Sequence, residues 1–303
     1  MKTGSITAVG TEMRSYYGRP IVKEPVWQPE IPLYFFFGGL AGASGVLHGL
    51  ARLTGNQPLA KTSLYVGATA DALSPALLIS DLGRPERFLN MFRVFKVTSP
   101  MSVGSWILLV SAGASTTAAA LELLGKLRPL KWAAELAWFA AGPPLATYTG
   151  TLIADTAIPV WHEARVELPW LFGASASATA GAAATLFLEP EDAGPARRTA
   201  IAGIAAELGL MHAMQKRLGF VGEVYKQGDA GRLGRASKLA TAAGAGLLAW
   251  KGKRSRSAAL AGGALVLAGE LAMRWSVFRA GFQSARDPRY TVIPQRERLR
   301  QQR

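Results

Sequence analysis

Long apolar runs alternate with short polar segments along almost the whole chain. Charge-free runs cover residues 97–121, 136–154 and 168–188, and each is close to the roughly 20 residues that a helix needs to cross the hydrocarbon core of a bilayer. A soluble protein would have to bury all three runs in one core, and a single-domain core is rarely that large. The pattern therefore predicts an all-α integral membrane protein.

The hydrophobic pattern predicts eight transmembrane helices, which we expect to form two four-helix bundles. Their predicted ranges are 32–54, 59–80, 103–124, 131–155, 168–188, 196–216, 233–250 and 257–280. No linker separates regions of different composition, so residues 32–281 are predicted to form one membrane domain. A polar tail over 1–31 precedes this domain, and a basic tail over 282–303, which we expect to be extended, follows it.

The distribution of charge predicts the orientation and the kind of partner. The net charge is +14, with 22 Lys and Arg residues on the side of the two tails and 11 on the opposite side. The positive-inside rule then places both termini in the cytoplasm, for a protein of the cytoplasmic (inner) membrane of a prokaryote. The basic residues form no basic domain, which argues against nucleic acid and favours membrane lipids and an acidic partner subunit.

The residue inventory argues against metal centres in this chain. The absence of cysteine excludes thiolate-bound zinc and iron–sulfur clusters ligated by this chain. Haem is disfavoured because His48 and His212 fall toward opposite membrane faces and His162 lies in a loop. We therefore expect no haem, no metal and no iron–sulfur cluster here.

Six segments carry a resemblance to a known family. They are YYGRPIVKEPVW, IPLYFFFGGLAGAS, DLGRPERFLNMFRVFK, SPMSVGSW, YTGTLIADTAIPVWHEA and SARDPRYTVIPQRER. With these segments the chain resembles the NrfD/PsrC-like membrane subunits of respiratory oxidoreductases, the polysulfide reductase NrfD family, over essentially its whole length.

The resemblance implies an eight-helix subunit that binds menaquinone or ubiquinone and holds no metal of its own. It also implies docking to a ferredoxin-like iron–sulfur subunit, which usually partners a molybdenum or tungsten catalytic subunit. Such a subunit is not catalytic by itself. It would pass electrons between the iron–sulfur subunit and the membrane quinone pool, with uptake or release of protons.

Two acidic residues are the first candidates for quinone binding. Family members place acidic residues near the quinone in the second and fourth helices, and this implies Asp71 and Asp155. Both would be desolvated carboxylates that are suited to shuttling a proton. Asp71 is followed by Ser74 and Pro75, a predicted kink. Alternatively, Asp71 is a structural partner of Lys61 or an interhelical acceptor, and Asp155 is a helix-end residue at the headgroup level.

Three further residues complete the predicted quinone site. Tyr148 precedes Asp155 by two helical turns, and Tyr34 lies early in the first predicted helix. Both are equally interpretable as aromatic residues of the membrane interface. His48 is included because the family places a histidine in the first helix, although a packed histidine is the more common finding.

Other ionisable residues predict a proton path and a docking surface. Glu207, Glu270 and Arg274 fall inside predicted spans. Glu270 and Arg274 have the i, i+4 spacing of a helical ion pair, so a structural role is as reasonable as a proton path. In the polar loop at 80–106, the residues Asp81, Arg84, Arg87 and Arg93 are predicted to dock the partner, with ordinary positive-inside charge as the alternative.

Two other functional classes fit parts of the pattern. A secondary transporter would also bury acidic residues at mid-membrane depth, but it would normally show broken helices in two corresponding halves. Only Gly142-Pro143-Pro144 suggests such a break. A structural anchor for a soluble dehydrogenase, without a quinone site, is the other alternative.

Overall fold

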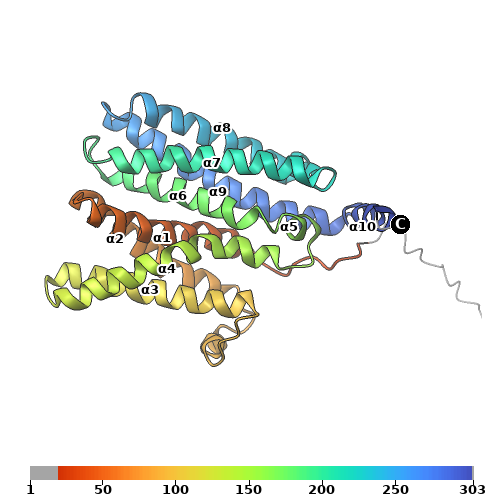
Figure 1. The fold of residues 1–303 in the computed structure, drawn as a ribbon, viewed down its shortest axis with the longest axis horizontal. Helices are drawn as coiled ribbons and strands as arrows, with labels where there is room; N and C mark the ends of the chain where they lie inside the picture. The colour runs from red at the N-terminus through yellow and green to blue at the C-terminus, as the bar shows by residue number, and fades with distance from the viewer. Residues whose placement is uncertain (1–19, 302–303) are drawn as a thin grey trace, which may run out of the picture.

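A computed structural model describes residues 20–301, and all regular secondary structure in that part of the chain is helical (Figure 1). Eight helices are 20 to 31 residues long. They are α1 (Glu30–Leu53), α2 (Gln57–Ser80), α3 (Pro100–Leu124), α4 (Arg128–Ala154), α6 (Leu168–Phe187), α7 (Gly194–Leu218), α8 (Gly228–Trp250) and α9 (Arg256–Arg286). Residues 1–19 of the predicted N-terminal tail lie outside the described residues, as do 302–303.

Three short helices connect long ones, namely η1 (Pro85–Phe92), α5 (Pro159–Glu163) and η2 (Val221–Lys226), and a fourth short helix, α10 (Arg289–Gln301), follows α9. All four lie at the end of the molecule where α1 begins, which we call the loop face (Figure 1). The opposite end carries only the tight connections at 54–56, 125–127, 188–193 and 251–255, and we call it the turn face.

The long helices agree with the eight predicted ranges in number and order, with two corrections. The last helix, α9, continues to Arg286, and α10 is also helical, so the prediction of an extended basic tail was wrong. By length and composition, three of the described helices are apolar enough to cross a membrane, namely Glu30–Leu53, Pro100–Leu124 and Arg256–Arg286.

The long helices pack as neighbours in two groups. Helices α1 to α4 contact one another, helices α6 to α9 do the same, and α1 and α4 join the groups through α6. Helix α1 crosses α4 closely, because a Cβ on Gly42 would lie 2.6 Å from the Gly142 carbonyl oxygen, and the reverse distance is also 2.6 Å. Helix α4 continues through Pro143 and Pro144, so the predicted break at 142–144 was wrong. Gly142 instead permits the close crossing.

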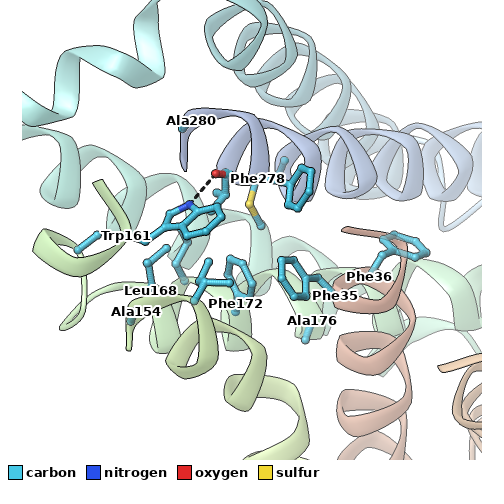
Figure 2. Packing of buried hydrophobic residues seen from close by; sticks show 14 of the residues in the cluster. Phe35, Phe36, Ala154, Trp161, Leu168, Phe172, Ala176, Phe278 and Ala280 are labelled. Carbon is cyan, nitrogen blue, oxygen red and sulfur yellow. Dashed lines mark hydrogen bonds between the residues drawn. The ribbon is translucent and has the colours of Figure 1, made fainter. Parts of the chain in front are cut away.

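Aromatic side chains fill the junction between the two groups near the loop face (Figure 2). The rings of Phe35 in α1 and Phe172 in α6 lie 5.8 Å apart between centroids. Trp161 is fully buried, and its indole N–H donates to the Val277 carbonyl oxygen of α9 at 2.8 Å. On its other side the Trp161 ring stacks on Trp27. These contacts connect α1, α5, α6 and α9 and thereby fix the loop face.

Candidate functional site

The centre of the first helix group is the carboxylate of Asp71, which is 0% exposed in the middle of α2. It accepts a hydrogen bond from Ser111 Oγ of α3, 2.9 Å from Oδ2 and 3.1 Å from Oδ1. Trp138 Nε1 of α4 donates to Oδ2 at 3.0 Å. Asp71 therefore connects three helices through donors, which is how a buried carboxylate is stabilised.

Trp138 reaches Asp71 because two glycines leave space for its ring. A Cβ on Gly67 of α2 would lie 2.4 Å from Trp138 Cζ2, and one on Gly45 of α1 would lie 3.0 Å from Cε2. Gly67 precedes Asp71 by one helical turn, so the same face of α2 supplies the space for the indole and the acceptor for its N–H. The ring is fully buried.

Two buried tyrosines lie on the loop-face side of Asp71. Tyr34 lies near both Tyr148 and Asp71. The Tyr148 ring fills a notch at Gly104 of α3, where a Cβ would lie 2.2 Å from the Tyr148 hydroxyl. Near Gly38, Tyr34 lies close to Ser74, one turn beyond Asp71. The structure thus brings together Asp71, Tyr34 and Tyr148 of the predicted quinone residues.

An apolar cavity of about 150 Å³ lies between α2, α3 and η1, and its lining does not include Asp71, Tyr34 or Tyr148. Its wall includes Pro75, Leu78 and Leu108, and Pro75 is one turn from Asp71. Helix α2 continues through Pro75, so the predicted kink does not interrupt the helix. The cavity offers apolar walls close to buried hydroxyl and carboxylate groups, a combination that suits small-molecule ligands.

Asp155 does not join the group. It is the exposed residue that follows α4 at the loop face, and it lines a polar cavity of about 480 Å³ with His162, Glu163 and Arg298. The prediction that it lies near the quinone together with Asp71 therefore receives no geometric support. Its place matches the alternative reading of a residue at the helix end.

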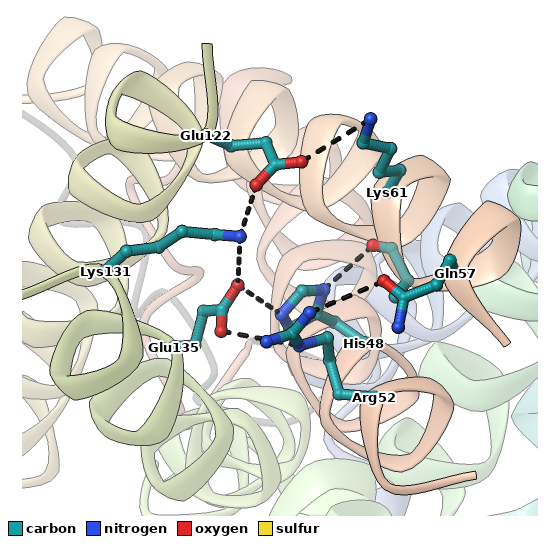
Figure 3. Close-up of polar contacts among 8 residues, drawn as sticks. His48, Arg52, Gln57, Lys61, Glu122, Lys131 and Glu135 are labelled. Carbon is teal, nitrogen blue, oxygen red and sulfur yellow. Dashed lines mark hydrogen bonds and ion pairs between the residues drawn. The ribbon is translucent and has the colours of Figure 1, made fainter. Parts of the chain in front are cut away.

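His48 lies toward the turn face, away from the tyrosines. Its Nδ1 is 2.8 Å from the Ala60 carbonyl oxygen and its Nε2 is 3.3 Å from Glu135 Oε1 (Figure 3). The prediction of a place beside the quinone residues is not supported, because His48 is a buried partner of Glu135. Its ring does pack on Trp138, with 5.5 Å between the ring centroids.

Several residues of the first helix group were not identified from the sequence. Nothing in the sequence marked Ser111 and Trp138 as partners of Asp71, because each is a single polar side chain inside an apolar run. Glu135 could have been identified, because Lys131 precedes it by one helical turn, and the two form an ion pair of 3.3 Å. Lys61 pairs with Glu122 at 3.6 Å, so the suggested pairing of Lys61 with Asp71 was wrong.

The second helix group holds another buried polar cluster. Ser175 Oγ donates to Glu270 Oε2 at 2.5 Å, and Glu207 of α7 faces Glu270 of α9. Arg274 donates to the Phe172 carbonyl oxygen at 3.0 Å and lies 3.9 Å over the Phe172 ring. The predicted ion pair between Glu270 and Arg274 is wrong, because Arg274 forms these contacts with α6 instead.

A cavity of about 150 Å³ extends from Glu207 past Tyr225 to Lys226 and Arg235 near the loop face. Glu207 Oε2 and Glu270 Oε1 are buried without a partner among the described residues. Two adjacent carboxylates with a polar cavity can hold one proton between them. The geometry therefore permits, for these residues, the exchange of protons with the loop face.

The predicted docking residues lie on and beside η1, which projects from the loop face (Figure 1). Arg84, Arg87 and Arg93 are all exposed. Asp81 differs, because it accepts a hydrogen bond from the Gln28 backbone N–H at 3.0 Å. Burial raises the pKa of Asp81 from its ordinary value, and the bond from Gln28 opposes this shift. Asp81 thus holds the N-terminal segment, whereas the three arginines are exposed and form no ion pair with the other residues that the structure describes.

Comparison with known proteins adds one match. A family model described as polysulfide reductase, NrfD type, matches residues 13–287. A comparison with curated proteins finds no match.

Proposed function

Because this chain belongs to the NrfD-like polysulfide reductase family, a family of membrane subunits of respiratory oxidoreductases, we propose that it binds a quinone and links a partner iron–sulfur subunit to the quinone pool. The observation that supports this most directly is the buried carboxylate of Asp71 with Tyr34 and Tyr148 near it, one turn of α2 from the apolar cavity at Pro75.

The residues present suit a quinone. A quinone ring has apolar faces and two carbonyl oxygens, which need hydrogen-bond donors when they leave water. Tyr34 and Tyr148 supply phenol donors, and the cavity at Pro75 and Leu108 supplies apolar walls. A bound quinone supplies chemistry that uses two electrons and two protons. Asp71 is placed to hold a proton and to pass it toward the phenol groups.

The loop face is the proposed docking side. The apolar cavity is bounded by Phe88 and Phe92 of η1, the helix beside the exposed arginines. A ferredoxin-like subunit bound to Arg84, Arg87 and Arg93 would bring its cluster close to this cavity, so that electrons reach the quinone by tunnelling. The molybdenum or tungsten catalytic subunit would bind this iron–sulfur subunit, without contact to the membrane.

We propose that all eight long helices cross the membrane, with both termini in the cytoplasm and the protein in the inner membrane of a prokaryote. Helices α2, α4, α6, α7 and α8 lack the apolar character of the other three over a full span. Their polar residues include Asp71, Glu135 and Glu207, which are buried against neighbouring helices instead of facing lipid.

The second helix group supports a further candidate role in proton movement. Glu207 and Glu270 lie together at mid-helix depth, and their cavity reaches the loop face. The Arg274 side chain lies near both carboxylates. A transporter is less well supported, because both α2 and α4 are continuous through their prolines. An anchor without a quinone site would use Asp71 only as the acceptor that joins α2, α3 and α4, and it would leave Tyr34 and Tyr148 without a role.

The test compares two aspartates of this chain. Asp71→Asn keeps the side-chain volume and removes the exchangeable proton, so it should slow reduction of a soluble quinone analogue about tenfold or more. Reduction of an artificial acceptor by the partner subunits should be unchanged. Asp155→Asn is the matched control and should leave both activities intact. Equal loss of both activities in Asp71→Asn would assign Asp71 a structural role.

A further inference from the structure

Glu135 is the centre of an ionic cluster at the turn-face end of the first helix group (Figure 3). His48 Nε2 lies 3.3 Å from Glu135 Oε1, and Lys131 Nζ lies at the same distance from that oxygen. Arg52 Nε is 3.6 Å from Oε2. Glu135 is 8% exposed and His48 is 2% exposed. A carboxylate therefore contacts an imidazole inside the protein, and imidazole is the side chain best suited to exchanging protons near neutral pH.

The cluster continues outward to the turn face. Lys131 also forms an ion pair with Glu122, whose other oxygen lies 3.6 Å from Lys61 Nζ. The Lys61 side chain is 64% exposed. Beside His48 and Glu135 the surface holds a cavity of about 370 Å³, which is ample for water molecules. Water at the turn face thus has access to the buried pair.

The hydrogen bond at Nδ1 decides which ring nitrogen of His48 carries hydrogen. Nδ1 faces the Ala60 carbonyl oxygen at 2.8 Å, and a carbonyl oxygen can only accept. Nδ1 therefore carries hydrogen. Nε2 faces Glu135 Oε1 at 3.3 Å, and neither atom has a hydrogen-bond partner among the described residues. A proton on either atom would let the two form a hydrogen bond, so the pair offers a place for a transferred proton.

Two buried hydroxyls lie between this pair and Asp71. Ser44 precedes His48 by one turn of α1, and Ser63 precedes Asp71 by two turns of α2. Each is 1% exposed, and each hydroxyl oxygen has no hydrogen-bond partner among the described residues. A Cβ on Gly67 would lie 2.8 Å from Ser44 Cβ, so Ser44 faces the turn of α2 that precedes Asp71. Unpartnered buried hydroxyls are costly and rare, and here they lie between two proton-exchanging groups.

We propose that the protons used at the quinone site enter from the turn face, through a first-group proton seam made of Glu135, His48, Ser44, Ser63 and Asp71. This inference rests on the proposed function and names its proton source. Each turnover takes two electrons from the partner iron–sulfur subunit and two protons from the turn face to form quinol. A proton that leaves the His48–Glu135 pair for Asp71 is replaced from water in the adjoining cavity.

This arrangement separates the two reactants. Electrons arrive from the loop face, where η1 lies, and protons arrive from the opposite face of the membrane. The reaction therefore moves charge across the membrane without a pump. The hydroxyls of Ser44 and Ser63 are needed for proton transfer but not for binding the quinone, which distinguishes them from Tyr34 and Tyr148.

The first measurement needs no variant. The complete complex is placed in vesicles with known orientation, and pH-sensitive dyes report on the lumen and the outer medium while a soluble quinone analogue is reduced. We expect alkalinisation on the side of the turn face. Alkalinisation on the side of the loop face would overturn the proposal.

The second measurement uses Ser44→Ala combined with Ser63→Ala, which removes both hydroxyls and keeps helix-forming residues. Quinone reduction should fall at least fivefold, with an unchanged KM for the analogue and unchanged reduction of an artificial acceptor. Thr179→Val is the control, because Thr179 is equally buried and bonds only the Ser175 carbonyl oxygen of its own helix. Wild-type rates in the double variant would overturn the proposal.

A wrong quinone site and a wrong proton seam would give different results. If Asp71→Asn also reduces quinone at the wild-type rate, the quinone site itself has been assigned wrongly. If Asp71→Asn is slow but the Ser44 and Ser63 variant is not, the quinone site stands and only the proton seam is refuted.

Discussion

The indole Nε1–H of Trp138 donates to Oδ2 of Asp71 over 3.0 Å, and the two residues lie 67 positions apart in the chain. This bond joins α4 to α2 in the interior of the first helix group. It fixes one oxygen of the carboxylate, while Ser111 approaches both oxygens from α3. The same indole packs on His48 through its ring. Trp138 therefore holds Asp71, the last residue of the proposed proton seam, in position next to the phenol groups of Tyr34 and Tyr148.

Trp138→Phe tests the role of this bond. The change keeps an aromatic ring in the space at Gly45 and Gly67 and removes only the donor. A hydrogen bond to a charged group contributes about 1.5–3 kcal/mol, so we expect quinone reduction to fall roughly tenfold through misplacement of Asp71. Steady-state rates with a quinone analogue would show this.

The control for that variant is Trp161→Phe. Trp161 is equally buried, and its N–H donates to the Val277 carbonyl oxygen in the aromatic junction. This change should lower the thermal unfolding midpoint and leave the rate per folded complex unchanged. If the two variants behave alike, the bond to Asp71 serves stability alone.

Gly104→Ala tests the place of Tyr148. A methyl group at Gly104 would lie 2.2 Å from the Tyr148 hydroxyl, so the ring must move. We expect a severalfold higher KM for the quinone analogue, because one donor leaves its position. Gly246→Ala inside α8 is the matched control, because a Cβ there meets nothing within 4 Å and the residue lies outside the proposed site. It should leave the KM unchanged, and a normal KM in Gly104→Ala would exclude Tyr148 from the site.

The sequence predicted the long helices well, because their lengths follow from apolar runs that polar segments interrupt. The wrong predictions concern segments whose structure does not follow from apolar runs, namely the C-terminal segment and the prolines of α4. The basic residues after 282 suggested an extended tail, but α9 continues past the apolar region to Arg286 and α10 is helical as well. Pro143 and Pro144 suggested a break, but α4 continues through them while Gly142 packs on α1.

The site was predicted only in part. Asp71 was identifiable because a carboxylate in an apolar helix is costly and so has a purpose. Its donors were not, because the approach of Ser111 and Trp138 depends on how α2, α3 and α4 are rotated against one another. Asp155 was grouped with Asp71 by family analogy alone. His48 lies far along α1 from Tyr34, and this separation could already have shown that it does not lie beside the tyrosines.

Reporter fusions test the proposed topology. Fusions at Arg303 and within 84–96 should both report a cytoplasmic location, and a fusion within 251–256 should report the external side. The reason is the excess of Lys and Arg on the loop face. The opposite pattern would invert the orientation and place the catalytic partner outside. Termini on different sides would show that one of the eight helices does not cross.

An ion pair between the last residue of α9 and the N-terminal segment gives a dependence on pH. The Arg286 side chain, bonded to Glu24 at 2.9 Å, lowers the pKa of Glu24 from its ordinary value. The stabilisation from this pair is complete above the ordinary pKa and is lost as pH falls through the lowered pKa. Hydrogen exchange of residues 20–29, corrected for intrinsic rates, should therefore increase at acidic pH. Arg286→Gln should give the same increase at neutral pH and remove the pH dependence.

Reversal of two charges tests the docking surface. Arg84 and Arg87 are exposed at the start of η1, where they can contact an acidic partner together. Changing both to Glu introduces like-charge repulsion, which costs several kcal/mol across an interface. We expect the iron–sulfur and catalytic subunits to dissociate from the membrane while this chain remains inserted. Co-purification with a tag on this chain measures the loss directly.

The matched control reverses two basic residues on the other face, Lys251→Glu with Arg254→Glu, and should leave the complex intact. High salt should also weaken the binding of the partner subunits to the wild-type chain. Dissolved ions screen the attraction between exposed charges, and the screening length is about 10 Å at 0.1 M salt. If the double reversal at Arg84 and Arg87 keeps both the partners and the quinone-linked activity, these arginines do not bind the partner. The contact would then have to come from other loop-face residues, such as those of α10.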